Sequence, residues 1–190
     1  MKNHAEKAAL LVMDMQNGIV SRFAENEEVL VPIQKAVASA REHQIPVIFV
    51  RVGFSEGYPE VNSKNKVFSA IASRGGMTTS DESTQIHDSV KPEGNEPIIT
   101  KYRVSAFAGS TLEVVLRSYQ IDSLILTGIA TSGVVLSTLR EAADKDYSIT
   151  VLSDACLDND PEVHRVLTEK VFPRQADVMT VQSWIETLVD

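Results

Sequence analysis

The stretch Ala-Leu-Leu-Val-Met-Asp-Met-Gln-Asn-Gly, residues 9–18, is an apolar run that ends in a carboxylate, Asp14. Its apolar residues are consecutive rather than alternating, which is typical of a strand covered on both faces. The run begins at Ala8, and similar runs follow at Pro46–Val52, Pro97–Thr100, Ser123–Thr127, Ser148–Leu152 and Asp177–Thr180. The chain therefore has six candidate strands.

Helix-like patterns fill most of the intervals between these strands, at Glu28–His43, Ser110–Tyr119, Gly133–Lys145, Pro161–Val171 and Gln182–Val189. Two of them carry start signals. Ser110 and Glu113 have the spacing of a capping box, and Asp160 before Pro161 is suited to cap a helix. Strands that alternate with helices predict an α/β fold, a three-layer α-β-α sandwich with a six-stranded, mainly parallel sheet. A length of 190 residues fits a single domain, residues 1–190.

The charge balance narrows the class of protein. The chain carries 26 acidic and 18 basic residues, a net charge of −8, and no cluster of Lys or Arg, so we expect no nucleic-acid surface. With a single cysteine, Cys156, no disulfide can form within the chain. The N-terminal residues show neither a signal-peptide pattern nor an apolar run long enough for a membrane span, which favours a cytoplasmic protein.

The stretch Gly53–Glu96 is long, polar and poorly patterned, with one candidate helix at Lys66–Ser73 ended by Gly75 and Gly76. Long loops inside a compact domain are usually functional or disordered. We expect an excursion over the strand ends that covers a substrate or contacts another subunit. A solvated loop without a role is the alternative.

Polar residues at the ends of the strands are the candidates for chemistry, because ligands of open parallel sheets bind outside the carboxyl ends of the strands. Asp14 ends the first run, and a partly desolvated carboxylate there is suited to general acid/base work. The alternative is an aspartate that caps the turn through its backbone. Lys101 ends the third run and could stabilise negative charge, or else extend into water at the rim.

Two further segments follow strand ends. The turn from Gly128 to Val134 joins a strand to a helix through small residues, which lets backbone N–H groups face an anion; the alternative is a plain tight connection. The loop after Lys101 supplies three candidate substrate-binding side chains, Arg103, Ser105 and Phe107. The turn after the first strand adds a fourth, Gln16.

Taken together, the Asp14 strand end, the Lys101 strand end and the Gly128–Val134 turn resemble, in order and spacing, the three motifs of the isochorismatase-like (cysteine hydrolase) superfamily. The resemblance runs from about Leu10 to Thr180. It implies an isochorismatase-like, Rossmann-like fold. It also implies that Asp14 is the acid/base carboxylate and Lys101 its partner, which makes both catalytic candidates.

The same resemblance implies a non-proline cis peptide between Ile129 and Ala130, and an oxyanion hole formed by the N–H groups of Ala130 and Val134. The chain departs from the family pattern at Val134, which occupies the position of the nucleophilic cysteine. Valine has no nucleophilic atom, so a thioester route through this position is excluded. Replacement by Cys156, or by Ser132 or Ser137 near the turn, is the less favoured alternative.

These residues predict a small-molecule hydrolase that works without a thiol. On this hypothesis Asp14 is the general acid for a vinyl ether or related substrate, Lys101 orients it, and Arg103 pairs with a substrate carboxylate. The alternative is a catalytically silent small-molecule-binding member of the family. A nucleotide-binding protein is disfavoured because no glycine-rich loop follows the first strand.

No cofactor is expected. The histidine-containing metal cluster of nicotinamidases is absent, since no histidine lies between His43 and His87. The resemblance also implies a homo-oligomer, either a dimer or a tetramer.

Overall fold

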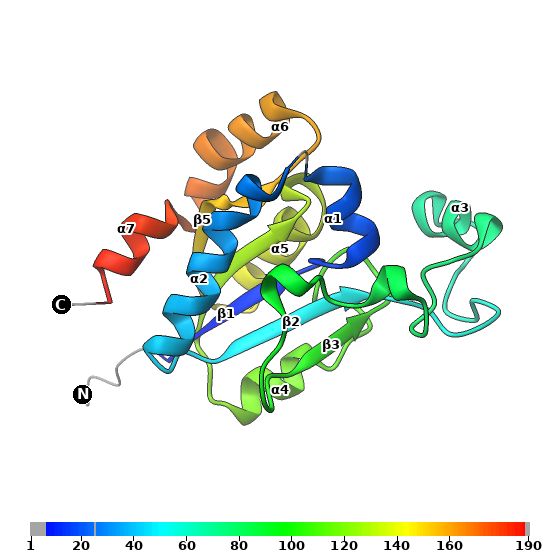
Figure 1. Cartoon of the computed structure of the whole chain (residues 1–190), viewed down its shortest axis with the longest axis horizontal. Coiled ribbons are helices and arrows are strands. Elements are labelled where there is room, and N and C mark those ends of the chain that lie inside the picture. The colour runs from blue at the N-terminus through cyan, green and yellow to red at the C-terminus, as the bar shows by residue number, and fades with distance from the viewer. Residues whose placement is uncertain (1–6, 25, 189–190) are drawn as a thin grey trace.

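The computed structural model describes residues 7–24 and 26–188 of the chain. Its centre is a six-stranded sheet in the order β3-β2-β1-β4-β5-β6 (Figure 1). The strands are β1 Ala8–Met13, β2 Val47–Val52, β3 Ile98–Lys101, β4 Ser123–Ile129, β5 Ser148–Leu157 and β6 Asp177–Met179. All five neighbouring pairs are parallel, so the predicted α/β fold and its parallel sheet are confirmed.

The α-helices are α1 Asn17–Phe23, α2 Val31–Glu42, α3 Lys66–Arg74, α4 Leu112–Ser118, α5 Leu136–Asp144, α6 Pro161–Val166 and α7 Val181–Glu186. Single 3₁₀ turns occupy Glu27–Leu30, Glu82–Thr84, Asp88–Val90 and Phe172–Arg174, and wider π-type turns occupy Thr131–Val135 and Leu167–Val171. The sequence did not predict α1. The predicted end of the last helix, Val189, lies outside the described residues.

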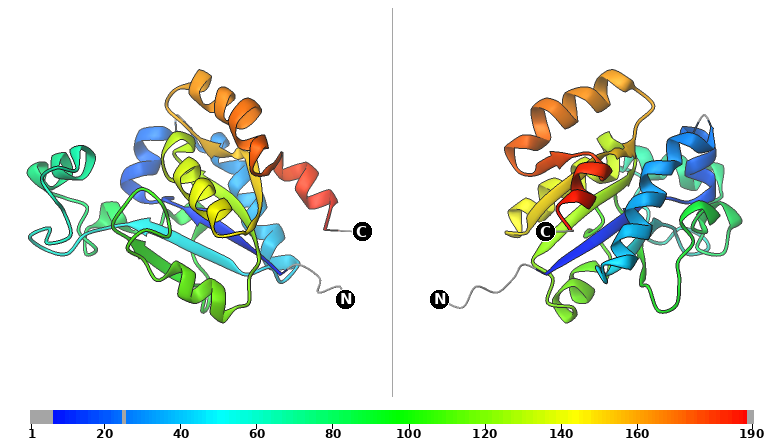
Figure 2. Two further views of the ribbon diagram at one scale, coloured as in Figure 1. Left: turned by 180° about the vertical axis from the view of Figure 1, so that it is seen from behind. Right: turned by 60° about the vertical axis from the view of Figure 1, so that its left-hand side comes forward.

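The two faces of the sheet are covered by different helices, as Figure 2 shows. On one face, Leu10 and Val12 pack with residues of α2 and α7. On the other, Leu11 and Met13 pack with residues of α4 and α5. Successive side chains of a strand point to opposite faces, so a strand between two helical layers buries every residue. This packing explains why the apolar residues of the first run are consecutive.

Helix starts depend on side chains that accept backbone hydrogen bonds. The Asp160 carboxylate accepts hydrogen bonds from the N–H groups of Glu162 and Val163, which confirms it as the cap of α6. The predicted capping box at Ser110 is wrong. Its hydroxyl accepts from the Leu112 N–H and donates to the Ala106 carbonyl, so the helix starts two residues later than expected, at Leu112.

The Gly53–Glu96 excursion lies at the carboxyl edge of the sheet and carries α3, which matches the predicted helix to within one residue (Figure 1). Phe54 anchors it, with its ring centroid 5.5 Å from that of Phe68 in an edge-to-face arrangement. The end of the excursion is tied to α2, where Arg41 forms ion pairs with Glu93 and Glu96. Within residues 7–24 and 26–188, no helix is long and apolar enough to cross a bilayer.

Candidate active site

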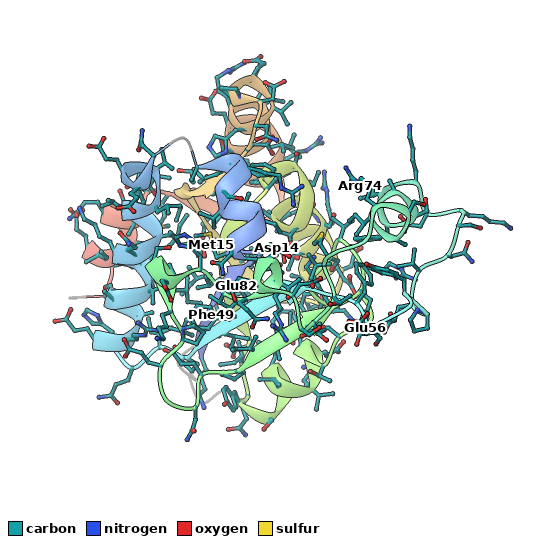
Figure 3. All side chains as sticks on the ribbon, turned by 45° about the vertical axis from the view of Figure 1, so that its right-hand side comes forward. Asp14, Met15, Phe49, Glu56, Arg74 and Glu82 are labelled. Carbon is teal, nitrogen blue, oxygen red and sulfur yellow. The ribbon has the colours of Figure 1, made fainter. Side chains whose placement is uncertain are left out.

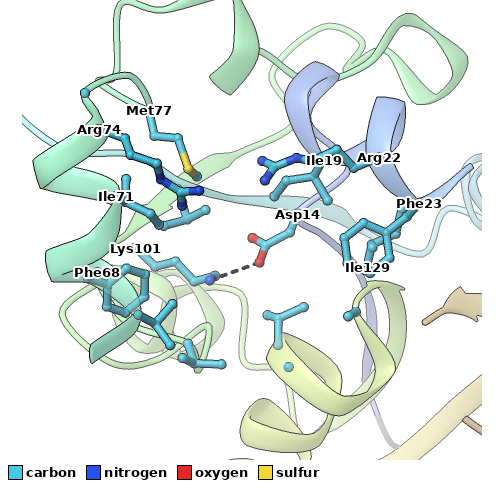
Figure 4. Close-up of a pocket in the computed structure, with 17 residues that line it drawn as sticks. Asp14, Ile19, Arg22, Phe23, Phe68, Ile71, Arg74, Met77, Lys101 and Ile129 are labelled. Carbon is cyan, nitrogen blue, oxygen red and sulfur yellow. Dashed lines mark ion pairs between the residues drawn. The ribbon is translucent and has the colours of Figure 1, made fainter. Parts of the chain in front are cut away.

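A pocket of about 490 Å³ opens at the carboxyl edge of the sheet, between α1, the start of α5 and the excursion that carries α3 (Figure 4). Its lining is mostly apolar, with four charged side chains, Asp14, Lys101, Arg22 and Arg74. Seen with all side chains drawn, Asp14 lies between α1 and the segment that bears Arg74 (Figure 3). The structure therefore brings Asp14 and Lys101 into one pocket.

Sheet register brings these two residues together. Val52 at the end of β2 is paired with Lys101 at the end of β3, and Val50 of β2 is paired with Met13 at the end of β1. Asp14 follows directly, with its N–H donating to the Val50 carbonyl at 2.8 Å. Its φ of 57° is in the left-handed region, which aspartate enters more readily than most residues. This turn directs the carboxylate away from the strand into the pocket.

Asp14 and Lys101 form a buried ion pair. Lys101 Nζ lies 3.1 Å from Asp14 Oδ2, and the two side chains are 2% and 8% exposed, lysine first. The same Nζ donates to the Arg103 carbonyl at 2.9 Å, which fixes the ammonium beside the carboxylate. The other carboxylate oxygen, Oδ1, is buried and has no hydrogen-bond partner among the described residues. One oxygen is thus held by the lysine, and the other is left for a ligand.

Burial raises the pKa of the Asp14 carboxyl above its ordinary value, although the charge and hydrogen bond of Lys101 act in the opposite direction. Removing a carboxylate from water disfavours its ionised form, and here that cost is the larger effect. A carboxyl group with a raised pKa keeps its proton to a higher pH than an ordinary aspartate, which suits a proton donor.

The turn after β4 forms the opposite wall of the pocket. Gly128 has a φ of 135°, and a Cβ built on it would lie 2.0 Å from the Met13 carbonyl oxygen, so only glycine fits between β4 and β1 here. The peptide bond between Ile129 and Ala130 is cis. Ala130 and Val134 both line the pocket, and Val134 is 2% exposed. The turn therefore shares the wall of the pocket with Asp14.

Contacts behind the turn hold it in place. The Ser132 N–H donates to a carboxylate oxygen of Asp158 at 2.7 Å, and the Thr131 hydroxyl lies 2.8 Å from His164 Nδ1. Asp158 directly follows the end of β5 and His164 lies in α6, so the segment after β5 and the next helix position the turn. No pattern in the sequence indicated that Asp158 and His164 support the turn.

The structure does not bring the four expected substrate-binding side chains into the pocket. The Gln16 amide is fully buried. It donates to the Val52 and Thr84 carbonyls and accepts from the Val52 N–H, which ties the excursion to the sheet. Arg103 donates to the backbone carbonyls of Tyr102 and Glu60, so its guanidinium does not face Asp14.

Ser105 and Phe107 are likewise used inside the fold. The Ser105 hydroxyl donates to Glu141 at 2.6 Å, and the Phe107 ring packs 6.0 Å from the Tyr147 ring. Neither residue lines the pocket. After β3 the chain turns under α5, and the residue from this loop that reaches the pocket is Val104.

Cys156 lies in the core of the sheet and does not line the pocket. It is 2% exposed, with its Sγ 3.9 Å from the Leu126 carbonyl oxygen. Burial raises the pKa of its thiol to about 12, so the thiol stays protonated near neutral pH. Ser132 and Ser137 are also absent from the pocket lining.

The pocket contains two further charged residues that no sequence pattern indicated. Arg22 comes from α1, and Arg74 comes from the last turn of α3. The apolar lining includes Ile19 and Phe23 of α1, Phe68 and Ile71 of α3, and Met77 in the excursion after α3. In the part of the chain that the structure describes, no three His, Cys, Asp or Glu side chains are grouped as a metal site would require.

Comparisons with known proteins place this geometry in a family. The model of the isochorismatase domain matches residues 8–183. The chain is 29% identical to the ureidoacrylate amidohydrolase RutB of Pseudomonas savastanoi pv. phaseolicola, over 97% of this chain and 82% of that protein. It is 30% identical to the isochorismatase family protein YecD of Escherichia coli O157:H7, over 97% of this chain and 98% of that protein.

Solved structures show the same fold. A cysteine hydrolase from Pseudomonas syringae pv. phaseolicola superposes with a TM-score of 0.87 at 21% identity, covering 96% of this chain and 92% of that one. An isochorismatase family protein from Burkholderia thailandensis superposes with a TM-score of 0.84 at 27% identity, covering 98% of both chains. The chain therefore belongs to the isochorismatase family and is a hydrolase.

Proposed function

We propose that the protein hydrolyses a small molecule by proton transfer at Asp14, with Lys101 as its partner and without a covalent thiol intermediate. The observation that carries this proposal is the buried Asp14–Lys101 pair, whose free oxygen Oδ1 lies at a pocket with no thiol in its lining. The four charged groups of the pocket include one carboxyl, so the proton-transfer role falls to Asp14.

The raised pKa of Asp14 supports a role as general acid. In its protonated form the carboxyl gives a proton to the substrate and becomes a carboxylate. The ammonium of Lys101, 3.1 Å away, stabilises the charge that this step creates. Because the pair is already in place, little reorganisation is needed when the proton moves.

Val134 supports a route in which water attacks the substrate directly. It occupies the position at which the family resemblance places the nucleophile, and its side chain has no nucleophilic atom. The single thiol, Cys156, lies in the core and stays protonated. We assign the N–H groups of Ala130 and Val134, in the turn that lines the pocket with Asp14, to the stabilisation of the oxyanion that develops when water attacks a carbonyl substrate such as an amide.

A vinyl ether suits this set of groups. Asp14 transfers its proton to the terminal carbon of the enol ether, forming a C–H bond and leaving an oxocarbenium ion. Water adds to the cationic carbon and returns a proton to the Asp14 carboxylate. The resulting hemiketal breaks its C–O bond to give a carbonyl compound and an alcohol. The steps need an acid, a stabilising cation and a water molecule, and no thiol.

The relatives named as ureidoacrylate amidohydrolases act on a different kind of bond, an amide of a urea. Two substrates therefore distinguish the bond types. Isochorismate tests hydrolysis of a vinyl ether and is assayed by pyruvate release. Ureidoacrylate tests hydrolysis of the amide bond and is assayed by ammonia release. Wild type is assayed beside Asp14→Asn, with Asp177→Asn at the edge strand β6 as the matched control. Turnover of either substrate by wild type and Asp177→Asn, but not by Asp14→Asn, is the expected result.

Turnover by all three variants would contradict the role assigned to Asp14. If no variant turns over either substrate while wild type and Asp14→Asn bind a ligand equally well, the catalytically silent binding protein becomes the better account. The single-domain organisation of residues 1–190, the cytoplasmic location and the homo-oligomeric assembly stay predictions.

A further inference from the structure

The pocket carries an excess of positive charge in an acidic protein. The chain has a net charge of −8, yet the pocket holds three cationic side chains and one carboxyl. Lys101 and Asp14 neutralise each other as a pair. Among the residues that the structure describes, no carboxylate forms an ion pair with Arg22 or Arg74.

Of the seven other arginines, three form ion pairs among the described residues and four, Arg51, Arg103, Arg140 and Arg174, do not; what distinguishes Arg22 and Arg74 is that both line one pocket. Arg41, Arg117 and Arg165 all form ion pairs with glutamates. In the described part of the chain, neither Arg22 nor Arg74 has a carboxylate within ion-pair distance. On a protein with more acidic than basic groups, two unpaired cations at one pocket are a feature that a ligand can explain.

Their own helices orient both guanidinium groups. Arg22 Nε donates to the Gly18 carbonyl at 2.7 Å, and Arg74 Nε donates to the Ala70 carbonyl at 3.3 Å. Each bond uses the inner nitrogen and leaves the two terminal nitrogens of the fork for another acceptor. Figure 4 shows the two guanidinium groups extending from opposite sides toward the space beside Asp14.

The rest of the wall is apolar. Phe23, Phe68, Ile71 and Met77 surround the same space, and Val134 closes it near the turn. Such a wall favours an uncharged hydrocarbon body, whereas planar arginine forks match the two oxygens of a carboxylate. We propose that Arg22 and Arg74 bind the carboxylate of a small organic anion whose apolar body fills the pocket. In placing the reactive end of this ligand at Asp14, the inference rests on the proposed function.

The arginines come from two separate parts of the fold, α1 against the sheet and α3 in the excursion. A carboxylate held between them bridges these parts. It therefore selects anionic substrates and keeps the apolar body over the Asp14 carboxyl.

Binding of simple probes tests the proposal without any turnover. The probes are benzoate and its neutral analogue benzamide, and dissociation constants come from NMR titration of the labelled protein. Benzoate is expected to bind wild type more tightly than benzamide, with an affinity that falls as salt is added. Because both arginines are exposed at the pocket mouth, each change of Arg22→Gln or Arg74→Gln is expected to weaken benzoate binding about three- to tenfold.

Matched variants separate a specific site from a general charge effect. Lys35→Gln removes one positive charge from the exposed side of α2 and is expected to leave benzoate affinity unchanged. Arg22→Lys and Arg74→Lys keep the charge without the fork and are expected to bind with intermediate affinity. Benzamide affinity is expected to be the same in wild type and in all of these variants.

Equal binding of benzoate and benzamide, no benzoate binding at millimolar concentration, or an equal loss in Lys35→Gln would overturn the proposal. These outcomes leave the proposed hydrolysis untouched, because Asp14 takes no part in the comparison. The opposite combination is also possible. If benzoate binding depends on the arginines and persists in Asp14→Asn, while the protein hydrolyses neither test substrate, the carboxylate site is supported and the proposed function is contradicted.

Discussion

Lys101 Nζ lies 3.1 Å from Asp14 Oδ2 inside a buried ion pair, while the second oxygen of the same carboxylate has no partner among the described residues. The pair unites the ends of two strands that are separated in the sheet by β2. One oxygen is held by Lys101, and the other is buried without a partner in a residue that lines the pocket. This asymmetry is what a proton donor needs, because the carboxyl is positioned by one atom and reacts through the other.

Asp14 gives the activity a defined dependence on pH. A general acid works in its protonated form, and burial raises the pKa of Asp14, so activity is expected to fall as pH rises through that raised pKa. A profile of kcat/KM against pH measures this fall in activity. NMR titration of the Asp14 carboxyl should give a midpoint at the same pH. A fall that survives in Asp14→Asn, or a midpoint at or below the ordinary aspartate value, would contradict the assignment.

The same shift affects stability. The folded state holds the Asp14 proton more tightly than the unfolded state, so this group contributes stability at low pH. The contribution is lost as pH rises from the ordinary pKa to the raised one. Urea unfolding of wild type and Asp14→Asn across this range is expected to show the loss in wild type alone. A wild-type stability that rises with pH relative to Asp14→Asn would show that the pKa is lowered instead.

Lys101→Met removes the cation from the buried pair. Breaking a buried pair by removing one partner costs about 3 kcal/mol, because the remaining charge is unpaired. Asp14 escapes part of this cost by taking up a proton, so the loss should be smaller at mildly acidic than at mildly alkaline pH. Denaturant unfolding measures the loss, and the double variant Asp14→Asn/Lys101→Met should recover part of it. A stability loss in Lys101→Met that does not depend on pH would show that Asp14 does not take up a proton when Lys101 is removed.

Gly128→Ala tests the close approach of β4 to β1. The added Cβ would lie 2.0 Å from the Met13 carbonyl oxygen, at a φ of 135°, so we expect a loss of about 4 kcal/mol or more, or failure to fold. Gly94→Ala is the control, since its φ is also positive but no atom lies within 4 Å of the new Cβ. The control should cost about 1 kcal/mol. Similar thermal stabilities for the two variants would contradict the packing described here.

Cys156 is expected to be inert in the folded protein. Its thiol is 2% exposed and its pKa is raised to about 12, so almost none of it is thiolate near neutral pH. A colorimetric disulfide reagent should label it at the rate at which the protein unfolds, and urea should speed the reaction. Rapid labelling of the native protein would show instead that the thiol is open to the pocket.

The sequence could predict the sheet, and the edge at which Asp14 and Lys101 lie, because both follow from local pattern and a general rule. Consecutive apolar residues identified the strands, and parallel strands bring their carboxyl ends to one edge. Asp14 comes directly after one such strand and Lys101 ends another, which places both at that edge, whereas their pairing was implied by the family resemblance. The bounds of α3 were equally local, since Asn65 caps its start and Gly75 follows its end.

The rest of the pocket depends on directions that no sequence pattern fixes. The loop after Lys101 was predicted to present Arg103, Ser105 and Phe107, but an irregular backbone gives no periodicity from which to read where side chains point. The contribution of Arg103 is its carbonyl, which holds Lys101. Arg22 lies on α1, a helix of seven residues with no side-chain cap. Its meeting with Arg74 depends on how the excursion folds back.

The most direct test of the central claim compares kcat/KM for one substrate in wild type, Asp14→Asn and Cys156→Ala. Our account predicts that Asp14→Asn loses at least about a hundredfold, as expected for removal of a general acid. It predicts that Cys156→Ala stays within about twofold of wild type, because a buried thiol acts only in packing. Full activity in Asp14→Asn together with an inactive, folded Cys156→Ala would contradict hydrolysis by Asp14 without a thiol.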